Sequence, residues 1–260
     1  IDGTGGPASG PVDIIVEDNK IVDIARVGVP KVAIDNSKRP KLGNGKTKEI
    51  DATGKYVMPG LIDLHVHTGG TPKAPEAEYV YKLWMANGIT TVRGVPFADM
   101  EWSLKEKKRS AKNEIVAPRM VSFHRIGTGK EWEDRKLGAH RPAIMEAVLD
   151  EANSLGMGST AHLAQSGVAQ MNAIDAARLG LTSITHFYGL FESMYENNDI
   201  QPWPVDINYG DEQHRFGQVA RQWNLVEPGG EKWNSLLDEF IELDFYINPT
   251  MTIYSAGRDV

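Results

Sequence analysis

The stretch MPGLIDLHVHTGG, residues 58–70, decides how this chain is interpreted. Apolar residues alternate in it with polar ones, and the polar series is Asp63, His65 and His67. Successive side chains on a strand point to opposite faces. The alternation therefore predicts a strand with one apolar face, while the other face presents two imidazoles side by side at the C-terminal end.

From Tyr56 onward, short strands rich in Val, Ile and Thr alternate with helical segments, which is the pattern of a parallel α/β sheet or barrel. The expected strands cover residues 57–67, 89–95, 118–125, a stub near 135–138, 159–164, 183–189 and 245–253. Apolar residues at helical spacing predict amphipathic helices at 142–155 and 231–243. An eighth strand is absent from the pattern.

One connection in this pattern is too short. The third expected strand ends near Gly127 and the fourth must begin near Arg135, whereas a parallel crossover needs about a dozen residues or more. We expect residues to be missing there, with a chain break near Asp134.

Composition excludes several classes of protein. The net charge is −7 and no basic stripe is present, which argues against nucleic acid as a partner. The chain lacks an apolar run of about 18 residues, so we expect a soluble protein that makes no contact with a membrane. With no cysteine, disulfides and thiol chemistry are excluded and the compartment stays open. The opening IDGTGGP resembles the interior of a β-rich domain, so we expect an upstream segment.

Two further histidines lie late in expected strands: His162 in STAHLA and His186 in SITHFYG. A lone histidine on a strand is more often a satisfied core residue than a ligand. In a parallel barrel, however, the C-terminal ends of the strands lie on one rim, where His65 and His67 would also lie. Four converging imidazoles have no good explanation in a core, since buried polar groups need partners. Imidazole suits Zn²⁺, so the pattern predicts a metal site.

The first-strand motif resembles that of the metal-dependent amidohydrolase superfamily. The resemblance implies a (β/α)₈ TIM barrel, incomplete here because strand eight is absent, with a small β-sandwich domain. A hairpin expected at residues 12–26 matches the sandwich. We expect residues 1–55 to form part of the sandwich and residues 56–260 to form the metal-binding barrel, truncated at its C-terminus.

By the same resemblance, His65 and His67 bind one divalent metal, most simply Zn, and His162 and His186 bind a second. Lys136, in RKLGAHRP, matches the lysine whose CO₂-derived carbamate bridges the two metals. Lys136 and His186 would thus take part in catalysis. The superfamily's proton-shuttle Asp is expected on the missing strand eight. Asp259, beside the terminus, is a poor substitute for it.

Other polar residues at the expected rim are candidates for contacting a substrate. They are His124, His140, Arg141 and Tyr188. An arginine can bind a carboxylate through two hydrogen bonds. We expect a small-molecule substrate, namely an amide, an N-acyl amino acid or a dipeptide, and a homo-oligomeric protein.

The expected function is hydrolysis of an amide or related C–N bond by a metal-activated hydroxide. One alternative is a mononuclear deaminase of the same superfamily. Such relatives pair the fifth-strand histidine with a downstream Glu, where HLAQSG has Gln165. Another is a catalytically inactive scaffold protein, although such relatives tend to lose metal ligands that are intact here.

Overall fold

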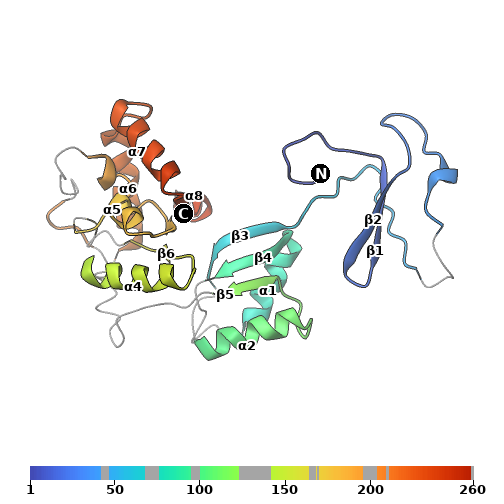
Figure 1. The fold of residues 1–260 in the computed structure, drawn as a ribbon, viewed down its shortest axis with the longest axis horizontal. Helices are drawn as coiled ribbons and strands as arrows, with labels where there is room; N and C mark the ends of the chain where they lie inside the picture. Colours follow the sequence, from blue (N-terminus) through green and yellow to red (C-terminus); the bar gives the residue numbers. More distant parts are fainter. Residues whose placement is uncertain are drawn as a thin grey trace.

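The structure is a computed structural model. It describes residues 1–41, 47–67, 76–94, 100–122, 142–163, 168, 170–195, 204–208 and 211–258. Along the chain in Figure 1, an N-terminal hairpin is followed by two separate parallel sheets, each accompanied by helices.

The hairpin consists of β1 (Val12–Glu17) and β2 (Lys20–Arg26), which pair antiparallel as expected. Asp18 in the connecting turn has a φ of 55°, in the left-handed region that such tight turns use. Within the described ranges, these two strands pair only with each other. The β-sandwich therefore stays a prediction.

The first parallel sheet has the order β3 (Leu61–Val66), β4 (Ile89–Gly94) and β5 (Arg119–Ser122). Two helices pack against it, α1 (Ala77–Ala86) and α2 (Met100–Ala111). The core between sheet and helices contains Val66, Ala77, Tyr81, Val92 and Met120. Because the strands are parallel and Val66 of β3 is paired with Gly94 of β4, the C-terminal end of β3 lies at the same sheet edge as those of its neighbours.

The second parallel sheet has the order β6 (Thr160–Ala161), β7 (Ser183–Thr185) and β8 (Tyr246–Asn248). Its helices are α4 (Pro142–Ser154), α5 (Ala173–Arg178), α6 (Glu212–Gln222), α7 (Glu231–Glu242) and α8 (Met251–Arg258). Short 3₁₀ turns lie among them at Glu192–Met194 and Trp223–Leu225, and another lies after the N-terminal hairpin at Asn36–Lys38. The larger of the two parallel-sheet cores lies here, around Leu163, Ile184 and Phe191.

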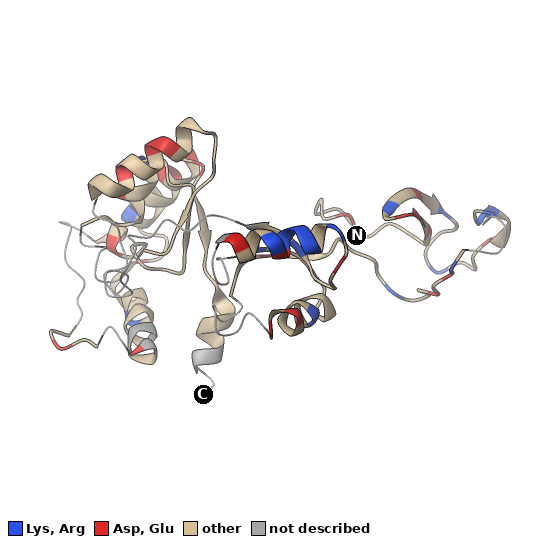
Figure 2. Ribbon diagram, turned by 90° about the horizontal axis from the view of Figure 1, so that it is seen from below, with Lys and Arg blue, Asp and Glu red and all other residues tan. Residues whose placement is uncertain are grey.

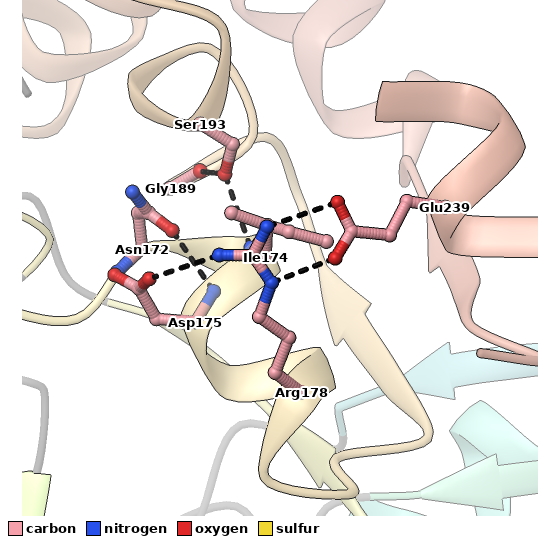
Figure 3. Close-up of polar contacts among 7 residues, drawn as sticks. All are labelled: Asn172, Ile174, Asp175, Arg178, Gly189, Ser193 and Glu239. Atoms are coloured by element: carbon pink, nitrogen blue, oxygen red, sulfur yellow. Dashed lines mark hydrogen bonds and ion pairs between the residues drawn. The ribbon is translucent and has the colours of Figure 1, made fainter. Parts of the chain in front are cut away.

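Polar contacts hold both ends of α5 (Figure 3). A capping box closes its N-terminus, since Asn172 and Asp175 each accept a hydrogen bond from the other's backbone N–H. At the other end, Arg178 forms a bidentate ion pair with Glu239 of α7, with distances of 2.7 and 3.0 Å. Because α5 is short, these contacts stabilise a helix that would be marginal alone.

Lys and Arg are distributed over separate elements in Figure 2, with one group on α2. Within that group Arg109 pairs with Glu78 of α1 and Glu106 of α2, each at 2.7 Å. Arg109 therefore links α2 to α1. Among the residues that the structure describes, no helix is both long and apolar enough to cross a bilayer.

Six expected strands and both expected helices are present, so the α/β class with parallel sheets is confirmed. The expected strand at 245–253 is wrong in its second half, because β8 ends at Asn248 and α8 begins at Met251. Pro249 has no N–H to continue the ladder. The stub at 135–138 and the predicted break near Asp134 lie outside the described residues, and closure of the sheets into a barrel stays a prediction.

The expected apolar faces are only partly buried. On β3, Val66 is buried, whereas Ile62 and Leu64 are 62% and 48% exposed, because α1 and α2 reach only the later part of that strand's face. On α7, Leu236 and Phe240 are buried and Ile241 is exposed. The helical spacing of apolar residues identifies which face of α7 is buried, but not how many residues around the helix that buried face includes.

Candidate functional site

The C-terminal end of β3 carries two of the four histidines. The Nε2 atoms of His65 and His67 lie 2.9 Å apart, and their ring centroids are separated by 4.8 Å. The Asp63 carboxylate accepts a hydrogen bond from the backbone N–H of His65 at 3.0 Å, which steadies this end of the strand. The alternation of the sequence thus places both imidazoles on one side of the chain.

The second sheet contributes the other two histidines. His162 follows β6 and His186 follows β7, and their ring centroids are 4.7 Å apart. The ring of His186 is also 5.4 Å from that of His65, so the four imidazoles form one continuous series across the two sheets. The Thr185 hydroxyl adds a longer contact of 3.5 Å to Nδ1 of His65.

Aromatic rings border this series of histidines. Tyr188 is buried, with its ring 5.2 Å from that of His162 and 5.7 Å from that of His186. Tyr254 of α8 lies 6.3 Å from His186, nearly perpendicular to it. These rings lie close to His186, which is itself buried.

Burial is the main cause that lowers the pKa of His65 to about 4, and repulsion from His67, His162 and Arg93 adds to it. Arg93 on β4 is held beside this strand because its Nε donates to the carbonyl of Leu64 at 3.1 Å. At neutral pH, His65 is therefore an uncharged imidazole. That is the protonation state in which histidine binds a metal.

The histidines fit a divalent cation as part of a ligand set. Two nitrogens bound to one Zn²⁺ at ~2.0–2.1 Å lie about 3 Å apart, which is close to the spacing between His65 and His67. Buried polar atoms without a hydrogen-bond partner in the described part of the chain also occur on flanking strands, namely Oγ1 of Thr160 and Nδ2 of Asn248. Within the described ranges, however, no group of three or more His, Cys, Asp or Glu side chains is arranged to hold a metal ion.

Four residues expected at the site lie outside the described residues, and their positions are not part of this geometry. They are His124, Lys136, His140 and Arg141. The structure brings together the other five: His65, His67, His162, His186 and Tyr188.

Sequence reasoning missed Thr250, whose hydroxyl is bonded to Nδ1 of His186. It lies in the segment expected to be strand, so nothing in the local pattern distinguishes it from the other threonines. Pro249, just before it, marks the end of the β8 ladder but does not single out Thr250.

No family model matches the chain. Curated proteins match parts of it. An adenine deaminase from Methanoculleus marisnigri is 52% identical over 50 residues, which are 19% of this chain and 9% of that protein. A dihydroorotase from Carboxydothermus hydrogenoformans is 27% identical over 184 residues, or 66% of this chain and 39% of that protein.

A D-hydantoinase from Streptomyces coelicolor is 30% identical over 98 residues, which are 36% of this chain and 19% of that protein. The chain therefore spans well under half the length of each of these three relatives.

Proposed function

We propose that this chain, whose curated relatives all point to the metal-dependent amidohydrolase superfamily, belongs to an enzyme that hydrolyses an amide or related C–N bond. The observation that carries the proposal is the continuous series of imidazoles from His67 to His162, which joins two sheets. The names of the relatives support a hydrolase acting on C–N bonds, and the histidines supply nitrogen ligands for the cations that we propose for it.

In this proposal His65 and His67 hold one divalent cation, and His162 and His186 hold a second. Lys136 supplies the bridging carbamate, Zn²⁺ is the proposed metal, and the proton shuttle is an Asp on strand eight of a complete barrel. When bound, such ions lower the pKa of water and polarise a carbonyl. The protein's own part is to keep His65 uncharged, which it does by burial.

The remaining rim residues would bind the substrate. Tyr188 lies beside His162 and His186, so its ring can pack against a bound molecule. His124, His140 and Arg141 are proposed to contact the substrate's polar groups, and Arg141 is suited to a carboxylate. The proposal also retains a barrel over residues 56–260, a sandwich that includes residues 1–55, and a homo-oligomer.

A deaminase is the second candidate. Of the three alignments described above, the one with the adenine deaminase has the highest sequence identity, although it covers a small share of both chains. In that case a single cation suffices and Lys136 has no role as a bridge. Metal stoichiometry and product therefore separate the two candidates.

The test uses protein loaded with Zn²⁺ and freed of excess metal by gel filtration. Metal per chain is measured by mass spectrometry, and hydrolysis is assayed on dihydroorotate, a hydantoin, an N-acyl amino acid, a dipeptide and adenine. The proposal expects two metals and cleavage of one of the first four, while one metal with ammonia released from adenine would favour the deaminase. Wild-type protein that binds no metal would overturn both candidate functions. His65→Ala is the matched control, because it measures background metal binding.

A further inference from the structure

His186 and Thr250 both follow the ends of neighbouring parallel strands, β7 and β8, with backbones in the left-handed region. Their φ angles are 67° and 51°. Residues other than glycine rarely adopt this conformation, and for a β-branched residue such as threonine it is an outlier. Such conformations persist where the surrounding contacts hold them, and they cluster at functional sites.

Two hydrogen bonds hold His186 to the β8 segment. Its backbone N–H donates to the carbonyl of Asn248 at 2.9 Å, which extends the pairing of the two strands by one step. Its side chain is bonded through Nδ1 to the hydroxyl of Thr250. With backbone and ring both attached to one segment, the orientation of the imidazole is fixed.

The direction of the second bond follows from the other contact of Thr250. Its Oγ1 also lies 2.7 Å from the carbonyl oxygen of Pro249, which can only accept a hydrogen bond. A hydroxyl has one proton, so both contacts are hydrogen bonds only if the hydroxyl donates to Pro249 and accepts from Nδ1–H of His186. In a neutral imidazole the lone pair is then on Nε2.

We propose that Thr250 is a positioning residue that holds neutral His186 with its proton on Nδ1, so that Nε2 is the nitrogen available to bind a metal. The assignment of the tautomer stands on the contacts of Thr250, while its consequence for metal binding rests on the proposed function. A hydrogen-bond acceptor behind a metal-binding histidine, commonly a carboxylate, backbone carbonyl or water, fixes its ring and tautomer in this way.

The tautomer is tested without metal, by NMR of the ¹⁵N-histidine-labelled protein, with the His186 signals assigned from their loss in His186→Gln. We expect the wild type and Thr250→Ser to carry the proton on Nδ1. Thr250→Val keeps the β-branched shape but lacks the hydroxyl, so we expect it to populate both tautomers. A wild-type proton on Nε2, or an unchanged tautomer in Thr250→Val, overturns the inference.

Zn²⁺ affinity, measured by competition with a chelator, provides the second readout. We expect Thr250→Val to bind about 10–100-fold more weakly than wild type, and Thr250→Ser to restore most of the loss. Equal affinity of wild type and Thr250→Val would overturn the positioning role. If the tautomer is as expected but wild type binds no Zn²⁺, the proposed function fails and the assignment of the tautomer stands. Circular dichroism establishes that each variant is folded.

Discussion

The Nε2 atoms of His65 and His67 face one another at 2.9 Å at the end of β3. Two neutral imidazoles cannot both direct a lone pair into so short a contact, because the lone pairs repel. In the metal-free protein one of these nitrogens therefore carries a proton and donates it to the other. A cation bound between them would take the place of that proton, which the ring would then carry on Nδ1.

Zn²⁺ binding at neutral pH is therefore expected to release little or no proton from this pair, because each neutral imidazole keeps its one proton and only carries it on Nδ1. Isothermal titration calorimetry in buffers of different ionisation enthalpy measures the number released. His67→Ala should bind at least 10-fold more weakly, since one ligand is lost. The control is His214→Ala on α6, which should bind as wild type does. Unchanged binding by His67→Ala would remove this pair from the site.

Gly60, in the motif before β3, is expected to tolerate no side chain. A Cβ there would lie 1.9 Å from Oγ1 and 2.6 Å from Cβ of Thr90, so β3 and β4 would have to separate. Gly60→Ala should cost about 1–3 kcal/mol of unfolding free energy, measured by urea denaturation. The matched control is Gly158, just before β6, where a Cβ would make an ordinary contact of 3.7 Å with Thr182. Gly158→Ala should change stability by about 0.5 kcal/mol or less.

The ion pair between Arg178 and Glu239 should contribute to stability at neutral pH and not in acid. The hydrogen bonds from Arg178 hold the pKa of Glu239 below its usual value. Since the folded pKa is the lower one, the contribution is present above the unfolded pKa and is lost as pH falls through the folded pKa. The pair is partly exposed, so Glu239→Gln should cost only about 0.2–1 kcal/mol at pH 7 and less below pH ~4. Glu242→Gln on the same helix is the control, and an equal loss in both variants would contradict this prediction.

The hydrogen bond from Gln222 to the buried carboxylate of Glu192 should contribute to the stability of the fold. The carboxylate oxygens accept from Nε2 of Gln222 and from the backbone N–H of Gly189, each at 3.0 Å. Gln222→Met keeps the apolar bulk but removes one donor, so the unfolding free energy should fall by about 1–3 kcal/mol. Gln213→Met, at an exposed position of the same helix, should be nearly neutral. If the two substitutions had equal effects, the hydrogen bond would make no net contribution.

Local sequence patterns were sufficient to predict the strands of the two parallel sheets and the helices α4 and α7, but not α8, where a strand was expected. Alternation between residues 61 and 66 is a property of chain neighbours, and so is the helical spacing of Leu236 and Phe240. The two histidines of β3 come together for the same reason, since residues two apart on a strand share a face. The α/β class and the pairing of His65 with His67 could therefore be predicted before the structure.

The contact between His65 and His186 depended on the tertiary structure. These residues belong to different sheets, so their 5.4 Å separation follows from how the sheets pack and not from any local period. The contact of Thr250 with His186 could not be predicted for the same reason, because the two residues are 64 positions apart in the chain. The exposure of Ile62 likewise reflects which helices cover β3. Periodicity determines which way a side chain points from its own element, whereas the packing of distant elements decides what it meets.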